Sequence, residues 1–150
     1  MSDIRIASAT PHDVMAWADL RQALWPDADL AGLREEALAW NRASAVALLA
    51  FDANGGAIGL AEASLRHDYV NGTDSSPVGF LEGWYVDPAW RGRGIGRALV
   101  AAVEAWTRAQ GCTELASDAL LDNAGSHAAH AACGFEETER VVYFRKRLDD

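Results

Sequence analysis

The feature that most constrains the fold is a glycine- and arginine-rich stretch that runs directly into an amphipathic helix. The stretch covers residues 91–97 and reads Arg-Gly-Arg-Gly-Ile-Gly-Arg. Apolar residues recur at helical spacing from there on, at Ile95, Ala98, Leu99, Ala102, Val103 and Trp106. Glycine tolerates positive φ and lets a ligand approach the backbone closely. Because the N–H groups and the dipole of a helix N-terminus attract anions, the stretch predicts a phosphate-binding turn.

Two common phosphate-binding motifs do not fit this stretch. A dinucleotide-binding fingerprint needs a third glycine where this chain has Arg97, and a P-loop needs a Lys-Ser/Thr pair that does not follow here. A flexible helix start with solvated charges is the plain alternative. Three arginines and three glycines in seven residues favour a phosphate-rich ligand instead.

The remaining patterns predict one mixed α/β domain over residues 1–150. Such a length buries enough surface for folding without disulfide or metal cross-links. Alternating or apolar runs bounded by turn residues predict strands over residues 4–7, 45–51, 57–65, 80–86, 114–117 and 141–147. Helical periodicity and capping residues predict helices over residues 11–25, 30–41, 95–110 and 123–133. The first of these helices has a typical start, with Thr10 as the cap, Pro11 at the first position and Asp13 in the first turn.

The charge balance narrows the class of ligand. The net charge is −9, with 22 acidic residues against 13 Lys and Arg. That balance argues against a nucleic-acid partner and suits a polycationic ligand, although many proteins are acidic only for solubility. No apolar run approaches the ~18 residues that cross a membrane, and the first ten residues lack a signal-peptide pattern, so we expect a cytoplasmic protein. Cys112 and Cys133 lie far apart without a CxxC pattern, so we expect no metal site.

The glycine-rich stretch resembles the acetyl-CoA loop of the GCN5-related N-acetyltransferases. Arg91, Gly94 and Gly96 match the family pattern Arg/Gln-x-x-Gly-x-Gly/Ala. Downstream, Asn123 followed by Gly134-Phe135 is similar to a second signature of the family, in which the Asn hydrogen-bonds the pantetheine arm. The resemblance implies a central, mostly antiparallel sheet flanked by helices, with acetyl-CoA as acyl donor and no metal.

Segments outside these motifs resemble one branch of the family, the aminoglycoside 6′-N-acetyltransferases. They are residues 24–26, 65–72, 75–78, 80–83 and 134–148. Enzymes of this branch acetylate the 6′-amine of antibiotics such as kanamycin and tobramycin. The resemblance therefore implies a cationic small-molecule substrate and an antibiotic-resistance activity.

Attack of an amine on a thioester needs carboxylates that orient the ammonium and accept its proton. Glu82 and Asp118 are the candidates, because each lies in or at the end of a strand that we expect to be central. By resemblance both line the aminoglycoside site, with Asp118 as the base. The plain alternatives are a turn cap for Asp118 and an outward-facing strand position for Glu82.

The resemblance also assigns contacts to acetyl-CoA. The strand near Gly83 carries a bulge in the family, and its backbone amides hold the pantetheine and polarise the acetyl carbonyl. The implied contact residues are Trp84, Tyr85, Val86, Arg91, Gly92, Arg93, Gly94, Ile95, Gly96, Arg97, Asn123 and His130. Many family members have Tyr where this chain has His130, so the histidine either protonates the leaving thiolate or only points at the cofactor.

Three further residues are implied to contact the substrate. Trp25 and Tyr69 match aromatic residues that stack on sugars or cations, although Trp25 equally suits a core position. Glu139 matches an acidic residue of the C-terminal tail that is implied to reach substrate, either within one chain or across the interface of a homodimer. A solvated surface acid is the alternative for Glu139.

Two other hypotheses compete with the aminoglycoside enzyme. One is an acetyltransferase of the same fold that acts on a polyamine, metabolite or peptide amine, which the acidic charge suits equally well. The other is a non-catalytic acyl-CoA-binding module, whose function would survive the loss of Glu82 and Asp118.

Overall fold

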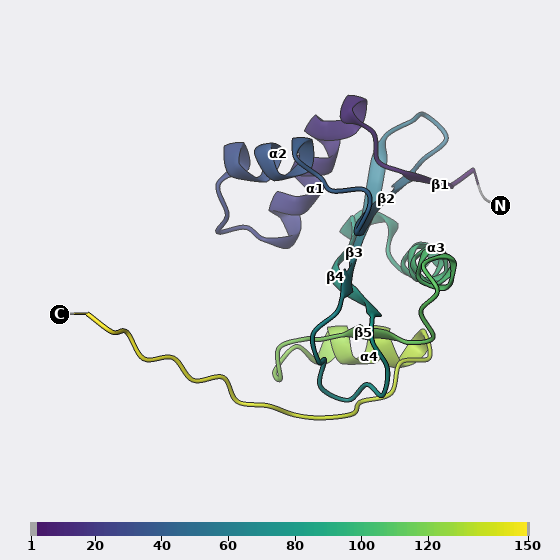
Figure 1. The fold of residues 1–150 in the computed structure, drawn as a ribbon. Helices are drawn as coiled ribbons and strands as arrows, with labels where there is room; N and C mark the ends of the chain where they lie inside the picture. Colours follow the sequence, from purple (N-terminus) through teal and green to yellow (C-terminus); the bar gives the residue numbers. More distant parts are fainter. Residues whose placement is uncertain (1–2, 150) are drawn as a thin grey trace. The chain divides into compact units, whose positions relative to one another are not determined.

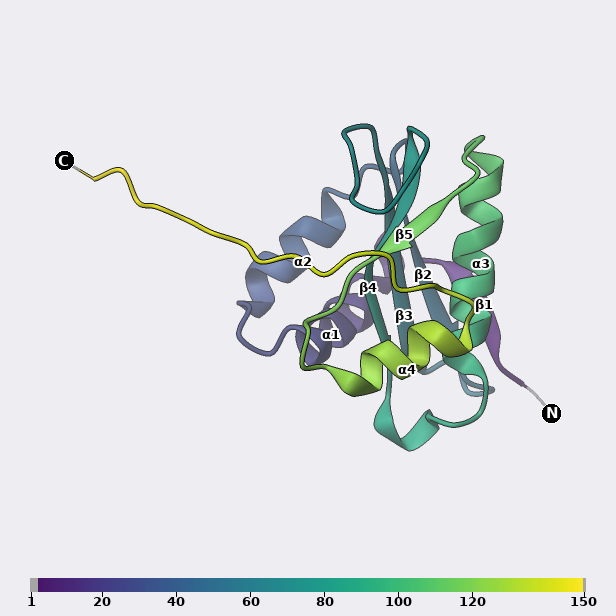
Figure 2. The same cartoon turned by 90° about the horizontal axis from the view of Figure 1, so that it is seen from below.

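The computed structural model describes residues 3–149, which fall into two compact units (Figures 1 and 2). The first unit ends at Asp118 and contains the sheet and most of the helices. The second begins at Ala119 and contains a single helix and the C-terminal tail. Each unit is described by itself.

The first unit is built on a five-stranded sheet whose strands follow the chain order from β1 to β5. The strands are β1 (Arg5–Ser8), β2 (Ala45–Phe51), β3 (Ala57–Arg66), β4 (Val78–Val86) and β5 (Leu115–Ser117). All neighbours are antiparallel except β5, which runs parallel to β4. The predicted mostly antiparallel α/β sheet is therefore confirmed.

Helices cover both faces of this sheet. They are η1 (Pro11–Asp13), α1 (Val14–Leu24), α2 (Leu30–Leu38), η2 (Pro88–Trp90) and α3 (Ile95–Ala109). Figure 1 shows α1 and α2 on one face and α3 on the other. The predicted helix start is confirmed: Thr10 Oγ1 accepts from the His12 N–H at 3.2 Å, and the Thr10 N–H donates to Asp13 Oδ2 at 2.8 Å.

The core consists of apolar side chains that are buried between the helices and the sheet. On the α1 and α2 face, Trp17, Leu49 and Leu60 are fully buried. On the other face, α3 buries a stripe of apolar side chains, Ile95, Leu99, Val100 and Val103. Their helical spacing explains why this was the clearest helix in the sequence.

The strand β4 carries a bulge beside Gly83, as the family resemblance implied. Glu62 of β3 pairs with Gly83, but its neighbour Ala63 pairs with Leu81, so Glu82 is an extra residue on β4. A bulge bends the strand and re-aims the side chain of the extra residue. Glu82 is exposed, whereas the residues on either side of it are buried.

The second unit consists of α4 (Ala124–Ala132) and an extended tail. Asn123 caps the helix, because its Oδ1 accepts from the Ser126 N–H at 3.1 Å, and Gly134 ends it with φ near +90°. The predicted strand over residues 141–147 is wrong for the single chain, in which residues 135–149 form no regular structure. A strand needs a hydrogen-bonding neighbour, and no element in the described part of the chain pairs with the tail. Tyr143 and Phe144 are consequently 85% and 92% exposed.

Candidate active site

The predicted anion-binding turn has the expected backbone. Gly92 and Gly94 have φ of +79° and +83°, a conformation that other residues adopt only with strain. Gly94 is the N-cap of α3, and its carbonyl accepts from the Ala98 N–H at 3.0 Å. The N–H groups of the first helical turn have no acceptor within the helix itself. Arg91, Arg93 and Arg97 lie next to these groups in the sequence, so the segment carries the kinds of donor that a pyrophosphate needs.

Two side chains fix this turn to the end of β4. The Trp84 indole N–H donates to the Gly96 carbonyl at 3.2 Å, and a Cβ at Gly96 would lie 3.3 Å from the indole ring. Arg91 Nε donates to the Val86 carbonyl at 2.8 Å, and its guanidinium carbon lies 5.5 Å from the Tyr85 ring centroid. The residues that the resemblance implied for acetyl-CoA thus hold one another in position within the first unit.

Ile95 cannot contribute its side chain to a ligand. The residue is 3% exposed and belongs to the apolar stripe of α3. Its contribution to the anion site can only be the backbone N–H.

The two candidate carboxylates lie at corresponding positions on neighbouring strands. Leu81 of β4 is paired with Ser117 of β5 in a parallel register, and the Ser117 hydroxyl donates to the Leu81 carbonyl at 3.3 Å. Glu82 is the next residue of β4, and Asp118 directly follows the end of β5. Pairing between the two strands stops at Leu81 and Ser117, so the two acids lie where β4 and β5 part.

Glu82 has partners on β3 that sequence reasoning did not find. Arg66 Nη2 lies 2.7 Å from Glu82 Oε1, and Arg66 Nε donates to Oε2 at 3.1 Å. The Ser64 hydroxyl also donates to Oε2. The only sequence signal was a polar alternation at the end of an otherwise apolar strand, which is common on exposed surfaces.

Trp25 lies beside the bulge. A Cβ at Gly83 would come within 2.9 Å of the Trp25 ring, so the ring packs directly on the glycine backbone. The backbone N–H of Trp25 donates to the Arg21 carbonyl at 2.8 Å. The Arg21 guanidinium lies 5.3 Å from the centroid of the Trp25 ring. Trp25 is half-buried and is therefore able to present the rest of its surface to a ligand.

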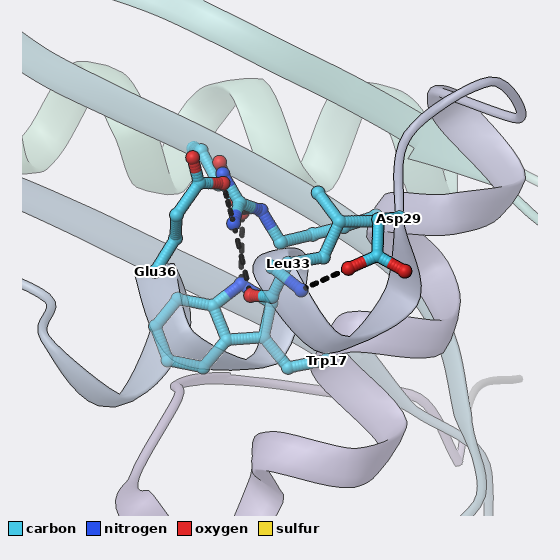
Figure 3. A network of polar contacts seen from close by, with 7 residues as sticks. Trp17, Asp29, Leu33 and Glu36 are labelled. Atoms are coloured by element: carbon cyan, nitrogen blue, oxygen red, sulfur yellow. Dashed lines mark hydrogen bonds and ion pairs between the residues drawn. The ribbon is translucent and has the colours of Figure 1, made fainter.

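A buried polar network holds the helix end that carries Trp25. Glu62 is 2% exposed, and its Oε2 accepts from the Trp17 indole N–H at 2.8 Å and lies 2.9 Å from Arg21 Nε. Arg21 Nη1 donates to Glu36 Oε1 at 2.8 Å and to the Leu33 carbonyl at 3.2 Å. Figure 3 shows Trp17 of α1 beside Leu33 and Glu36 of α2 in this network. Burial raises the pKa of Glu62, while Arg21 and the indole N–H act in the opposite direction.

Tyr69 stands on a polar loop between β3 and β4, where it is 73% exposed. Glu114 anchors this loop, because its Oε1 accepts from the Asp74 N–H at 2.9 Å and from the Ser75 hydroxyl. These hydrogen bonds, with that from Ser75 the largest cause, lower the pKa of Glu114. The loop is thus tied to the start of β5.

The other candidates lie in the second unit. His130 is on α4, where Nδ1 lies 2.7 Å from the Ser126 carbonyl and the ring packs edge-on against Phe135. Glu139 is exposed in the tail. Within residues 3–149, no group of three or more His, Cys, Asp or Glu side chains could hold a metal ion.

The sequence and fold are those of a known class of enzyme. A model of the acetyltransferase (GNAT) family matches residues 14–135, so this chain belongs to that family. An aminoglycoside N(6′)-acetyltransferase type 1 of Stenotrophomonas maltophilia is 61% identical over 144 residues, which are 96% of this chain and 94% of the relative.

Solved structures of aminoglycoside 6′-N-acetyltransferases share this fold. The aminoglycoside antibiotic 6′-N-acetyltransferase AAC(6′)-Ih from Acinetobacter baumannii is 46% identical, with a TM-score of 0.91 over 97% of this chain and 99% of that one. AAC(6′)-Iy in complex with the bisubstrate analogue CoA-S-monomethyl-acetylneamine is 45% identical, with a TM-score of 0.89 and the same coverage. Among the described residues, no helix is both long and apolar enough to cross a membrane.

Proposed function

We propose that this chain transfers the acetyl group of acetyl-CoA to the 6′-amine of aminoglycosides. The observation that carries the proposal is the pair of acids, Glu82 and Asp118, where β4 and β5 part, beside the aromatic ring of Trp25. The relatives named above act on aminoglycosides, and the net charge of −9 suits a polycation. Antibiotic resistance is the expected consequence of this activity.

Acetyl-CoA would be held by the turn before α3 and by the end of β4. The pyrophosphate fits the first-turn N–H groups and the three arginines of residues 91–97. The pairing of β4 with β5 ends at Leu81, so residues 84–86 of the bulged strand can offer backbone groups to the pantetheine on that side. The family resemblance also assigns Asn123 and His130 to acetyl-CoA, and the family match across residues 14–135 supports a single acetyltransferase domain.

The chemistry is direct attack of the amine on the thioester. The amine nitrogen bonds to the acetyl carbonyl carbon, and the carbon–sulfur bond breaks. Asp118 accepts the proton of the amine, directly or through water, and coenzyme A leaves as the thiolate. Backbone N–H groups beside the bulge stabilise the oxyanion. Glu82, Trp25, Tyr69 and Glu139 orient the cationic substrate.

The enzyme is expected to work as a homodimer. The tail over residues 141–147 is extended and exposed, its first four residues are apolar or aromatic, with Val142 at 77% and Phe144 at 92%, and β5 is one of the two edge strands of the sheet. An exposed strand edge and an unpaired β-prone segment favour pairing between two copies. Such pairing would supply the hydrogen bonds that the predicted strand lacks in the single chain. It would also carry Glu139 toward the second copy.

The oligomeric state tests the dimer directly. Sedimentation equilibrium of the full chain should give twice the 16.1 kDa mass of one chain. Phe144→Asp should give the mass of one chain, since the charge cannot be buried in an apolar interface. A wild-type monomer at micromolar concentration contradicts this part of the proposal.

The activity is tested by release of the coenzyme A thiol. Kanamycin and tobramycin should be turned over rapidly, and an analogue with a 6′-hydroxyl should not react. Spermidine tests the alternative polyamine enzyme: if its kcat/KM exceeds that of the aminoglycosides, the proposed substrate class is wrong. Because cytoplasmic metabolism makes acetyl-CoA, we also propose that the enzyme acts in the cytoplasm.

A further inference from the structure

The carboxylate of Glu82, which is proposed to bind the substrate, already forms an ion pair with Arg66 of the same chain. Arg66 approaches both carboxylate oxygens, with Nη2 2.7 Å from Oε1 and Nε 3.1 Å from Oε2. The Ser64 hydroxyl donates to Oε2 as well. A carboxylate has about four acceptor positions, and these three contacts occupy most of them. An ammonium group that comes to Glu82 therefore meets an occupied carboxylate.

Arg66 is fixed in this position by the strand that carries Glu82. Its guanidinium carbon lies 3.5 Å from the centroid of the Phe80 ring, two residues before Glu82 on β4. Stacking on an aromatic face and a two-point contact with a carboxylate are both geometries that favour arginine over lysine. The pair remains accessible to water, with 43% of the Arg66 side chain and 31% of the Glu82 side chain exposed. A soluble cation can therefore reach Glu82 and compete with Arg66.

We propose that Arg66 determines specificity by acting as a built-in counter-ion of Glu82. The inference rests on the proposed aminoglycoside activity, in which Glu82 faces the cationic substrate. A substrate must displace or share the guanidinium before its ammonium gains the full attraction of Glu82. Arg66 thus weakens the binding of a cation only to the extent that this cation depends on Glu82 itself.

The consequence depends on how many charges the substrate carries. An aminoglycoside has several ammonium groups and a large ring surface, so contacts with other acids and with Trp25 offset the competition. A small diamine has no such additional contacts and loses most of its binding. Specificity is the difference between the affinity for an aminoglycoside and that for a small amine. Competition by Arg66 weakens the binding of the small amine more, so it increases this difference.

The test compares Arg66→Met with a matched control. Methionine keeps an unbranched stem on Phe80 and removes the charge. Arg5→Met removes the same charge from an arginine that also stacks on a phenylalanine, since the Arg5 guanidinium lies 4.4 Å from the Phe51 ring on the opposite edge of the sheet. The probes are kanamycin, spermidine and 1,4-diaminobutane, with acetyl-CoA at saturation.

Arg66→Met should raise the kcat/KM for 1,4-diaminobutane about fivefold relative to that for kanamycin, the change expected from one exposed ion pair. Arg5→Met should leave the ratio unchanged. Arg66→Lys retains the charge and should stay within about twofold of the wild type. If Arg66→Met instead lowers the kcat for every amine without changing the ratio, Arg66 only positions Glu82 and the proposal is wrong.

Two further measurements keep the test decisive. Should Arg66→Met fail to fold, Arg66→Gln removes the charge while its planar amide still packs on Phe80, and the same ratio is expected to change. If the wild type acetylates no aminoglycoside, the proposed function fails, and calorimetric titration of 1,4-diaminobutane still tests Arg66. Tighter diamine binding by Arg66→Met than by Arg5→Met supports the counter-ion, and equal binding overturns it.

Discussion

Gly83→Ala should damage the aminoglycoside site while leaving the acetyl-CoA site intact. The new Cβ would lie 2.9 Å from Trp25 Cη2, 3.1 Å from Trp25 Cζ2 and 3.0 Å from Leu24 Cδ2. Carbon atoms in van der Waals contact are normally about 3.5–4.0 Å apart, so the indole must move by about 0.6–1 Å. A displacement of about 1 Å in a substrate-positioning group costs as much as about 100-fold in rate.

The expected result is a kcat/KM for kanamycin that falls by about 10- to 100-fold, with an unchanged KM for acetyl-CoA. Overpacking of this kind costs about 1–3 kcal/mol, which lowers the Tm by about 2–12 °C in a protein of this length. Coenzyme A release under steady state gives the kinetic constants, and differential scanning calorimetry gives the Tm.

Gly79→Ala is the matched control for this experiment. Its Cβ would lie 2.7 Å from the buried side chain of Thr107, between β4 and α3 and away from Trp25. It should lower the Tm by a similar amount without changing the KM for kanamycin. The reasoning is refuted if Gly83→Ala lowers the Tm but leaves the kinetics of kanamycin unchanged, or if the two variants have the same kinetics.

Three further predictions follow from the backbone and the buried charges. Gly94→Ala places a side chain at φ near +83°, which costs about 1–2 kcal/mol, and should raise the KM for acetyl-CoA without changing that for kanamycin. Burial raises the pKa of Glu62 above its ordinary value of 4.5, so folding binds a proton and stability falls as pH rises from 4.5 through the raised pKa. Urea unfolding should therefore show the stability of the wild type falling relative to that of Glu62→Gln across this window, and a constant difference contradicts the assignment. Glu114 has a lowered pKa, so its stabilisation is present above 4.5 and is lost as pH falls through the lowered value. Glu114→Gln should increase hydrogen exchange in the loop over residues 67–77 at neutral pH, and unchanged exchange would show that the loop does not depend on this anchor.

The elements with a strong local signal were predictable from the sequence. The apolar stripe of α3 and the capping box before α1 depend on residues close together in the chain, and both are confirmed. The bulge beside Gly83 came only from the resemblance, because no local pattern indicates that Glu82 has no opposite residue in the strand register with β3. The comparisons with known proteins confirm the family and its fold.

The features that could not be predicted from the sequence depend on contacts between residues far apart in the chain. The final strand was predicted from β propensity over residues 141–147, but propensity cannot supply the neighbour that a strand requires. Arg66 is sixteen positions from Glu82, and the register between β3 and β4 alone brings them together. Glu62 contacts Trp17 across forty-five positions, so its burial also follows from the tertiary fold rather than from its neighbours in sequence.

The most direct test of the account is the effect of Asp118→Asn on aminoglycoside acetylation, measured together with the binding of coenzyme A. A general base contributes about 10²–10⁴-fold, so the kcat/KM for kanamycin should fall by at least about 100-fold. The Kd for coenzyme A should remain within about twofold, because the proposed pyrophosphate site lies at the start of α3. Full activity of Asp118→Asn would contradict the proposed base, and an equal loss of coenzyme A binding would contradict the proposed division between the two sites.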